Sequence, residues 1–217
     1  MRLLFAFFAL LTAMPALAHE PAGNRPTPGF VRVRVDTSEG PFVVAVDMRH
    51  APATSANFLA YVDDGRLDDT SFYRAARRRS APGLGFVQGG IRTDARRILP
   101  PFRFEPTSRT GIRHLDATIS MARGSSSDSA GGNFFVTVGP TLAMDAAGQY
   151  MGYAAFGRIV AGMGTIKRIL AKPTGGGSGA MKGQMIFRPV LIRSARRLDG
   201  TPKPTGRPKV WKIGTAS

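Results

Sequence analysis

The chain has 217 residues, of which 43% are hydrophobic, with 26 Gly and 16 Pro; this composition supports one large or two small domains with many turns. Thirty Lys and Arg against 14 Asp and Glu give a net charge of +16, which excludes an acidic, solvating protein. The absence of cysteine excludes a disulfide scaffold, a thiolate metal site and a cysteine nucleophile.

The first 18 residues are typical of a secretory signal peptide. Arg2 supplies the positive start, residues 3–14 are almost wholly apolar, and Ala-Leu-Ala at 16–18 offers a small-x-small cleavage pattern. The apolar run of about a dozen residues is too short to span a bilayer, so we expect no membrane-spanning segment. We expect cleavage after Ala18 and export to a bacterial periplasm. There, surface polyanions and anionic lipids, rather than nucleic acid, are the acidic partners that a basic chain meets.

The remaining chain alternates between short strands and turns. Residues 19–28 form a predicted proline-rich leader, and alternating apolar residues over 30–36 and 42–47 predict a hairpin. Pro52 and Gly65 bound a predicted helix. Further strands are expected over 70–74, 86–91, 118–121, 133–138, 154–160 and 188–198, a second helix over 163–170, and loops over 125–132 and 173–183. Residues 199–217 form a predicted flexible basic tail with no core pattern. Many short strands with two helices predict a mainly β domain, either a closed barrel or a sandwich.

Six segments in order resemble the cyclophilins, a family of peptidyl-prolyl cis-trans isomerases, and most of all their bacterial periplasmic branch. They are residues 51–65, Phe72-Tyr73-Arg74, 86–90 (FVQGG), 118–123 (TISMAR), 130–135 (AGGNFF) and 152–159 (GYAAFGRI). The resemblance implies a cyclophilin-like domain over residues 29–198. Its implied fold is a closed eight-stranded antiparallel β-barrel capped by two α-helices, with the active site on the outside of the barrel.

The implied activity is rotation of X–Pro bonds, which breaks no covalent bond and therefore needs no nucleophile, metal or cofactor. By resemblance Arg74 is the donor to the twisted amide, and Gln88 and Asn133 are its polar partners. The implied proline pocket is formed by Phe86, Phe135, Met144 and Tyr153, with Ala122 and Arg123 lining the adjacent groove. Phe134 is expected in the barrel core. The implied substrates are proline-containing, unfolded or partly folded exported polypeptides, whose folding the enzyme would assist as a monomer.

The chain departs from the family pattern at several positions. Arg74 and Gln88 are separated by 14 positions rather than the usual eight, so that Ala76–Ala81 resembles an inserted loop. As a result Gly85 stands in the place of the usual Phe, and Phe86 stands in that of the usual Met. Asn133 stands in place of a longer Gln, which shortens its reach. Tyr73 replaces a His, and Ala143 stands where many members have the Trp that contacts cyclosporin. We therefore expect weak cyclosporin binding, which a titration would test.

Two other functions are compatible with parts of the sequence. A non-catalytic module that binds proline-containing segments, or a holdase, is suggested by the altered loop and by Asn133. A copper site at His19 of the predicted mature N-terminus, with His50 or His114, is the less favoured reading, since His19 lies in the leader. The basic residues Arg77, Arg78, Arg79, Lys203, Arg207, Lys209 and Lys212 are expected to be solvated, with at most weak contact to anionic surface polymers.

Overall fold

The structure is a computed structural model that describes residues 27–212, so the predicted signal peptide and His19 lie outside the described part of the chain. The strands are β1 (Phe30–Thr37), β2 (Gly40–Asp47), β3 (Thr70–Arg78), β4 (Ala81–Gly90), β5 (Thr118–Met121), β6 (Asn133–Val138), β7 (Ala154–Ala161), β8 (Thr174–Gly175) and β9 (Met185–Arg197). The helices are α1 (Pro52–Asp63), α2 (Thr107–Thr110) and α3 (Met163–Leu170). Within residues 27–212 no helix is long and apolar enough to cross a membrane.

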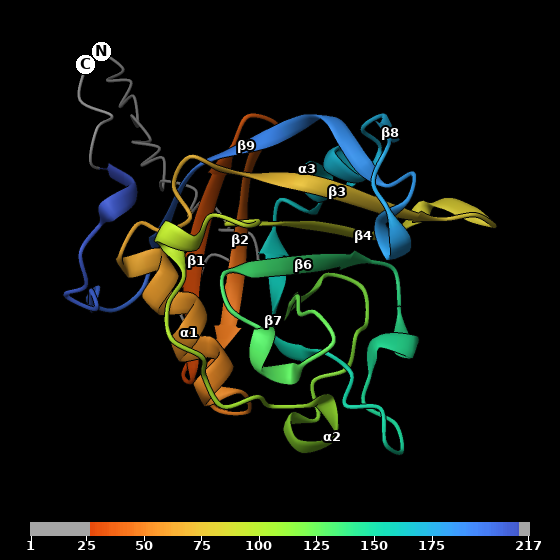
Figure 1. The fold of residues 1–217 in the computed structure, drawn as a ribbon. Coiled ribbons are helices and arrows are strands. Elements are labelled where there is room, and N and C mark those ends of the chain that lie inside the picture. The colour runs from red at the N-terminus through yellow and green to blue at the C-terminus, as the bar shows by residue number, and fades with distance from the viewer. Residues whose placement is uncertain (1–26, 213–217) are drawn as a thin grey trace, which may run out of the picture.

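Eight of these strands form a closed antiparallel barrel (Figure 1). Their order is β1-β2-β7-β5-β6-β4-β3-β9, and the pairing of β1 with β9 closes the ring. The two-residue strand β8 adds to the outer edge of β9. The structure thus selects the closed barrel over the sandwich and confirms the predicted fold.

Alternating side chains separate the barrel core from its outer surface. Val33 and Val35 of β1 point into the core, whereas Arg34 between them is exposed. On β6, Phe134 is buried among other core rings, and its centroid lies 5.6 Å from that of Phe72. The next residue, Phe135, belongs to the opposite face because successive side chains of a strand alternate. The prediction of a core role for Phe134 is confirmed.

Two helices cover the barrel. Helix α1 begins with Pro52 at its first turn and packs against β2, β7 and β9. Gly65, just beyond its end, adopts a positive φ of 68°, as expected of a residue that stops a helix. Helix α3 packs against β2, β3, β4 and β6 (Figure 1). The single turn α2 was not predicted, since four residues carry no helical periodicity.

The β3–β4 hairpin is longer than predicted. The expected loop at Ala76–Ala81 is largely strand, because β3 continues to Arg78 and β4 resumes at Ala81 after a turn at Arg79 and Ser80. Figure 1 shows this yellow hairpin projecting beyond the rest of the barrel. The extra residues therefore extend two paired strands and do not form a separate loop.

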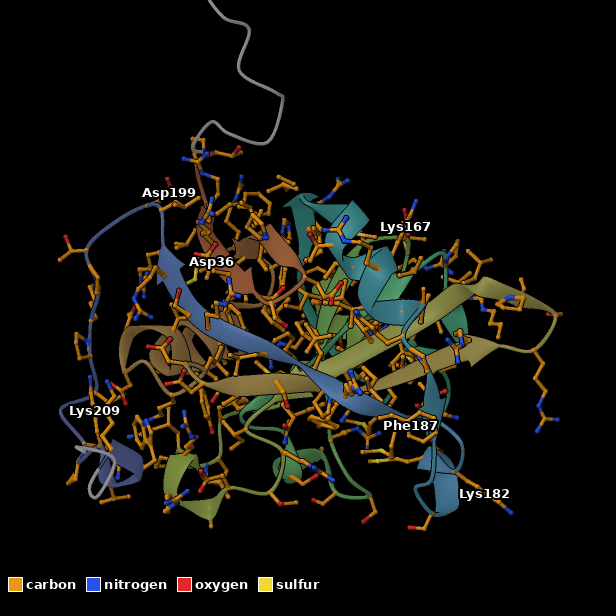
Figure 2. All side chains as sticks on the ribbon, turned by 90° about the horizontal axis from the view of Figure 1, so that it is seen from above. Asp36, Lys167, Lys182, Phe187, Asp199 and Lys209 are labelled. Atoms are coloured by element: carbon orange, nitrogen blue, oxygen red, sulfur yellow. The ribbon has the colours of Figure 1, made fainter. Side chains whose placement is uncertain are left out.

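Residues 199–212 pack along the outside of the domain. Figure 2 shows this segment, which starts at Asp199, on one side of the barrel, and Asp199 pairs with Arg32 at 2.9 Å. Trp211 is only 5% exposed, with the guanidinium of Arg66 lying 4.6 Å from its ring centroid. The sequence of this segment has no core pattern, because a single aromatic residue produces no periodicity but can still bury its ring.

Candidate active site

A β-bulge in β3 brings Arg74 to the outer face of the barrel. Strict alternation would place Phe72 inside, Tyr73 outside and Arg74 inside. In the structure Phe72 and Ala75 are both core residues, while Phe72 opposes Gly89 and Arg74 opposes Gln88, so that Tyr73 is the extra residue. A bulge of this kind redirects a side chain without ending the strand. Tyr73 and Arg74 thereby lie on the same face.

The strand register then aligns the predicted site residues across three strands. Arg74 of β3 opposes Gln88 of β4, and Gln88 opposes Phe135 of β6. Phe135 in turn opposes Ser120 of β5. A cation, an amide and an aromatic ring therefore stand side by side on the barrel surface, although up to 61 positions separate them in the chain.

Three hydrogen bonds hold the Arg74 guanidinium. Its Nη1 donates to Oε1 of Gln88 at 2.9 Å, its Nε to Oε1 of Gln184 at 2.8 Å, and its Nη2 to the carbonyl of Ala180 at 3.0 Å. The group also lies 4.9 Å from the ring centroid of Phe86. Burial lowers the pKa of Arg74, but a guanidinium stays charged at any physiological pH. The site thus holds a fixed, partly desolvated cation.

Gln88 links Arg74 to Tyr73 and Asn133. The 7% exposed Gln88 accepts from Arg74 and donates from Nε2 to the Tyr73 hydroxyl at 2.9 Å. That hydroxyl donates to Oδ1 of Asn133 at 3.2 Å, and burial raises the pKa of Tyr73, which keeps the proton in place. Asn133 also accepts from the backbone N–H of Arg92 at 2.7 Å and donates to its carbonyl at 2.9 Å. Its amide therefore mainly fixes Arg92 and Tyr73.

The aromatic residues form a small cavity beside Arg74. Phe135 lies 5.5 Å from Phe86 and 5.3 Å from Tyr153, centroid to centroid. The cavity has a volume of about 50 Å³ and is lined by Arg74, Phe86, Gln88, Ala122, Arg123, Phe135, Met144, Tyr153 and Met181. Eight of the nine predicted residues are thus brought together. The ninth, Asn133, lines an adjoining cavity of about 300 Å³.

Gly85 explains why Phe86 supplies an aromatic wall of the cavity. Gly85 has a φ of 145°, and a Cβ built on it would lie 2.0 Å from the carbonyl oxygen of Ala76. No side chain fits there, so an aromatic ring at this bend can come only from the next position. The Phe86 side chain accordingly packs on Phe135.

Arg123 closes the groove on the side of Tyr153. Its Nε donates to the carbonyl of Gly152 at 2.8 Å, and its guanidinium lies 5.2 Å from the Tyr153 ring centroid. Further bonds from Nη1 to the carbonyls of Gly124 and Ser125 hold the adjoining loop. The charge of Arg123 thus faces the groove, and no carboxylate among the described residues pairs with it.

A buried histidine that was not predicted as part of the site supports Phe135 from behind. His114 is fully buried and stacks on Phe135 at 5.6 Å, and its Nδ1 lies 2.6 Å from Oδ1 of Asp145 and its Nε2 lies 3.0 Å from the Ser120 hydroxyl. Burial lowers the pKa of His114, so the ring is neutral, donates to Asp145 and accepts from Ser120. Burial alone would raise the pKa of Asp145, but the bonds from His114 lower it overall. This group also fixes the chain that carries Met144.

The segment before β9 forms part of the site, although it was predicted only as a Gly-rich loop. A 3₁₀ turn over Gly179–Met181 places the Ala180 carbonyl on Arg74 and lines the cavity with Met181. Gln184 supplies the third partner of Arg74. No local motif marks these residues, since their role depends on a contact between residues 110 positions apart.

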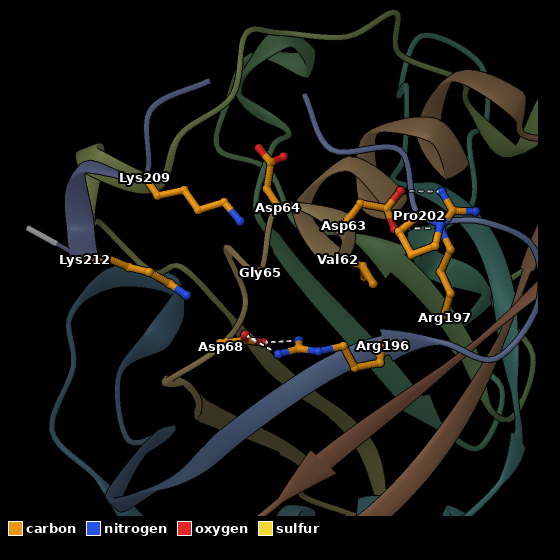
Figure 3. A pocket seen from close by; sticks show the side chains of 10 residues that line it. All are labelled: Val62, Asp63, Asp64, Gly65, Asp68, Arg196, Arg197, Pro202, Lys209 and Lys212. Carbon is orange, nitrogen blue, oxygen red and sulfur yellow. Dashed lines mark hydrogen bonds and ion pairs between the residues drawn. The ribbon is translucent and has the colours of Figure 1, made fainter. Parts of the chain in front are cut away.

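A further cavity, of about 200 Å³, lies away from this site, between α1, β9 and residues 199–212 (Figure 3). Its Asp63 binds Arg197 at 2.6 Å and its Asp68 binds Arg196 at 2.7 Å, so these carboxylates are already neutralised. Within residues 27–212 no group of three or more His, Asp or Glu could hold a metal ion. The row of Arg74, Gln88 and Phe135 beside its aromatic cavity makes that cavity the candidate active site.

Comparison with known families agrees with this geometry. The model of the family "Cyclophilin type peptidyl-prolyl cis-trans isomerase/CLD" matches residues 30–196. The chain belongs to the cyclophilins. The prediction of a peptidyl-prolyl isomerase is thereby confirmed.

Individual cyclophilins support the assignment. The peptidyl-prolyl cis-trans isomerase A of Dickeya dadantii is 34% identical over 163 residues, which cover 74% of this chain and 81% of that protein. The isomerase cyp18 of Streptomyces antibioticus is 31% identical over 169 residues, covering 76% and 98%. A crystal structure of a Cryptosporidium parvum cyclophilin, obtained in the presence of the dipeptide Ala-Pro, superposes with a TM-score of 0.60 at 20% identity, covering 78% of this chain and 99% of that one. At this identity, the similarity to the Cryptosporidium parvum structure shows only that the two chains share a fold.

Proposed function

We propose that this cyclophilin accelerates X–Pro rotation in exported polypeptides and that Arg74 stabilises the twisted amide. Rotation faces a barrier of about 18–20 kcal/mol because the nitrogen lone pair is conjugated with the carbonyl. Uncatalysed exchange therefore takes about 10–100 s. A site that binds the twisted amide more tightly than either planar form lowers this barrier without a covalent intermediate or a metal.

The hydrogen-bond inventory of Arg74 supports this role. A guanidinium has five N–H donors, and three of them are used by Gln88, Gln184 and Ala180. One donor on Nη1 and one on Nη2 remain for substrate. As the amide twists, its nitrogen becomes pyramidal and basic, so a donor aimed at the nitrogen or carbonyl binds more strongly in the transition state.

The remaining site residues would bind the proline itself. Phe86, Phe135, Met144 and Tyr153 offer an apolar surface for the pyrrolidine ring next to the free donors of Arg74. Ala122 and Arg123 border the groove along which the peptide would extend. Gln88 and Asn133 act as positioning residues in this scheme, since their amides bind protein groups.

The proposal rests on one observation, the row that Arg74, Gln88 and Phe135 form across neighbouring strands. The test is prolyl cis-trans exchange in a short X–Pro peptide, measured by NMR with and without the protein. Exchange faster than the uncatalysed rate, at catalytic concentrations of protein, is the expected result. A folded protein that binds the peptide without accelerating exchange would reduce the chain to a proline-binding module or holdase.

The cellular setting is part of the same proposal. The apolar segment at 3–14 and the Ala-Leu-Ala at 16–18 support export, cleavage after Ala18 and a periplasmic location of the bacterial branch. Assistance to the folding of exported chains follows from that location. Cell fractionation with N-terminal sequencing tests it, and an intact Met1 on the folded protein would contradict it. The exposed Ala143, next to Met144, favours weak cyclosporin binding, measurable by titration.

A further inference from the structure

The cavities at the active site carry positive charge, with no carboxylate among their described lining residues. Besides the cavities of about 50 and 300 Å³, a third of about 430 Å³ adjoins them, and Met181 lines all three. Among the described residues that line these cavities there are three arginines, Arg74, Arg92 and Arg123, and no Asp or Glu. The groove therefore carries one sign of charge along its length.

Several arginines outside the groove are, by contrast, paired with carboxylates. Arg66 and Arg197 each pair with an aspartate at 2.7 and 2.6 Å. Near the groove, the ion pairs of Asp94 are with Arg96 and Arg97. The field at the groove is thus that of uncompensated guanidinium groups.

Arg92 is placed for binding a ligand. Its φ of 54° is unfavourable for a residue with a side chain, and both of its backbone groups are held by the Asn133 amide. The exposed guanidinium lies 5.7 Å from the Tyr73 ring centroid and has no carboxylate partner in the described part of the chain. A guanidinium with free donors binds a carboxylate through two parallel hydrogen bonds.

We propose that the site prefers proline-containing segments that carry a carboxylate near the X–Pro bond, and that Arg92 is the main residue that recognises it. The proposal rests on the proposed isomerase function and names its substrate class. With the proline in the cavity beside Arg74, the neighbouring peptide residues enter the adjoining cavities that Arg92 lines. A flanking Glu or Asp then meets Arg92, whereas a flanking Lys or Arg meets three like charges.

The experiment compares peptides that differ only in Glu or Gln, placed two residues before or two residues after the proline. Exchange is measured by NMR, and the ratio of kcat/KM for the Glu peptide to that for the Gln peptide is taken at low and high salt. We expect a ratio of about two to five in the better position, the size of an exposed ion pair. It should approach one as salt rises.

Matched variants separate a contact with Arg92 from the general attraction of a basic protein. Arg92→Gln should bring the ratio close to one, and Arg92→Lys should keep part of it. Arg158→Gln removes the same charge from an exposed position of β7 outside the three cavities and should leave the ratio unchanged. A ratio of one in the unmodified protein, or equal ratios in Arg92→Gln and Arg158→Gln, would overturn the proposal.

The isomerase function and the charge preference can fail separately. If neither peptide is turned over, their affinities are compared by chemical-shift titration. Tighter binding of the Glu peptide, lost in Arg92→Gln, would support the preference even though the isomerase proposal had failed. Equal affinities would contradict both.

Discussion

Removing the free donors of Arg74 should abolish most of the catalysis. Arg74→Ala deletes both donors that are available to the substrate, together with the three bonds that hold them. Loss of one such preorganised donor typically lowers turnover about 10²- to 10³-fold, or about 2.7–4 kcal/mol of transition-state stabilisation. We expect kcat/KM for prolyl exchange to fall at least that far. Arg74→Lys keeps the charge but loses the planar fork that serves Gln88 and Gln184 together, so we expect an intermediate loss of about 10- to 100-fold.

Arg77→Ala is the matched control for this series. Arg77 lies on the same strand and also makes three hydrogen bonds, to the carbonyls of Leu170 and Lys172 and to the hydroxyl of Thr174. Both alanine variants should therefore lose a similar stability, about 1–3 kcal/mol by urea denaturation. Only Arg74→Ala should lose turnover. An Arg74→Ala variant that keeps kcat/KM within about threefold of the unmodified protein would refute the donor assignment, because a lost donor costs far more. Equal losses of turnover in the two variants would indicate general damage to the hairpin.

Three further predictions concern the residues that support the site and the fold. Gln184→Ala should lower kcat about three- to tenfold with little change in KM, because Arg74 loses one of the bonds that orient it. The loss stays moderate because Gln88 and Ala180 still hold the guanidinium; an unchanged kcat would contradict this. Trp211→Ala should lower the free energy of unfolding by about 3 kcal/mol while leaving turnover of the folded protein unchanged, and denaturation with activity assays tests both. Because burial lowers the pKa of His114, the unfolded chain takes up a proton more readily and stability should fall as the pH drops below about 6.5. A pH series of unfolding should show a smaller fall in His114→Gln; identical slopes would contradict the assignment.

Strand alternation predicts most of the barrel but not the position of Arg74. The β1–β2 hairpin, β5, β6 and α3 follow from apolar periodicity almost to the residue. The bulge at Tyr73 does not, because it depends on pairing with β4 and β9 and on the buried neighbours Phe72 and Ala75. The local sequence indicates the bulge only through Tyr73 and Arg74, which follow one another between the buried Phe72 and Ala75.

The site residues that were missed depend on distant contacts. Gln184 and Met181 lie in a Gly-rich stretch that carries no pattern, and they join the site because β9 pairs with β3. The supporting role of His114 follows only from the folded structure, which places Asp145 and Ser120 around its ring. By contrast, the fold brings together around one cavity all the site residues that were assigned by resemblance, except Asn133. Motif resemblance assigned residues that line the cavity, whereas the residues that hold them in place depend on contacts that only the fold creates.

The extended hairpin shows how the chain accommodates extra residues next to its active site. Arg74 and Gln88 are 14 positions apart, yet they are direct partners across β3 and β4. Additional residues divided between two paired strands move the turn outward and leave the register below it unchanged. Arg77 then ties the extension to the carbonyls of Leu170 and Lys172. The altered loop, which suggests a non-catalytic module at the level of sequence, therefore leaves the pair of Arg74 and Gln88 intact.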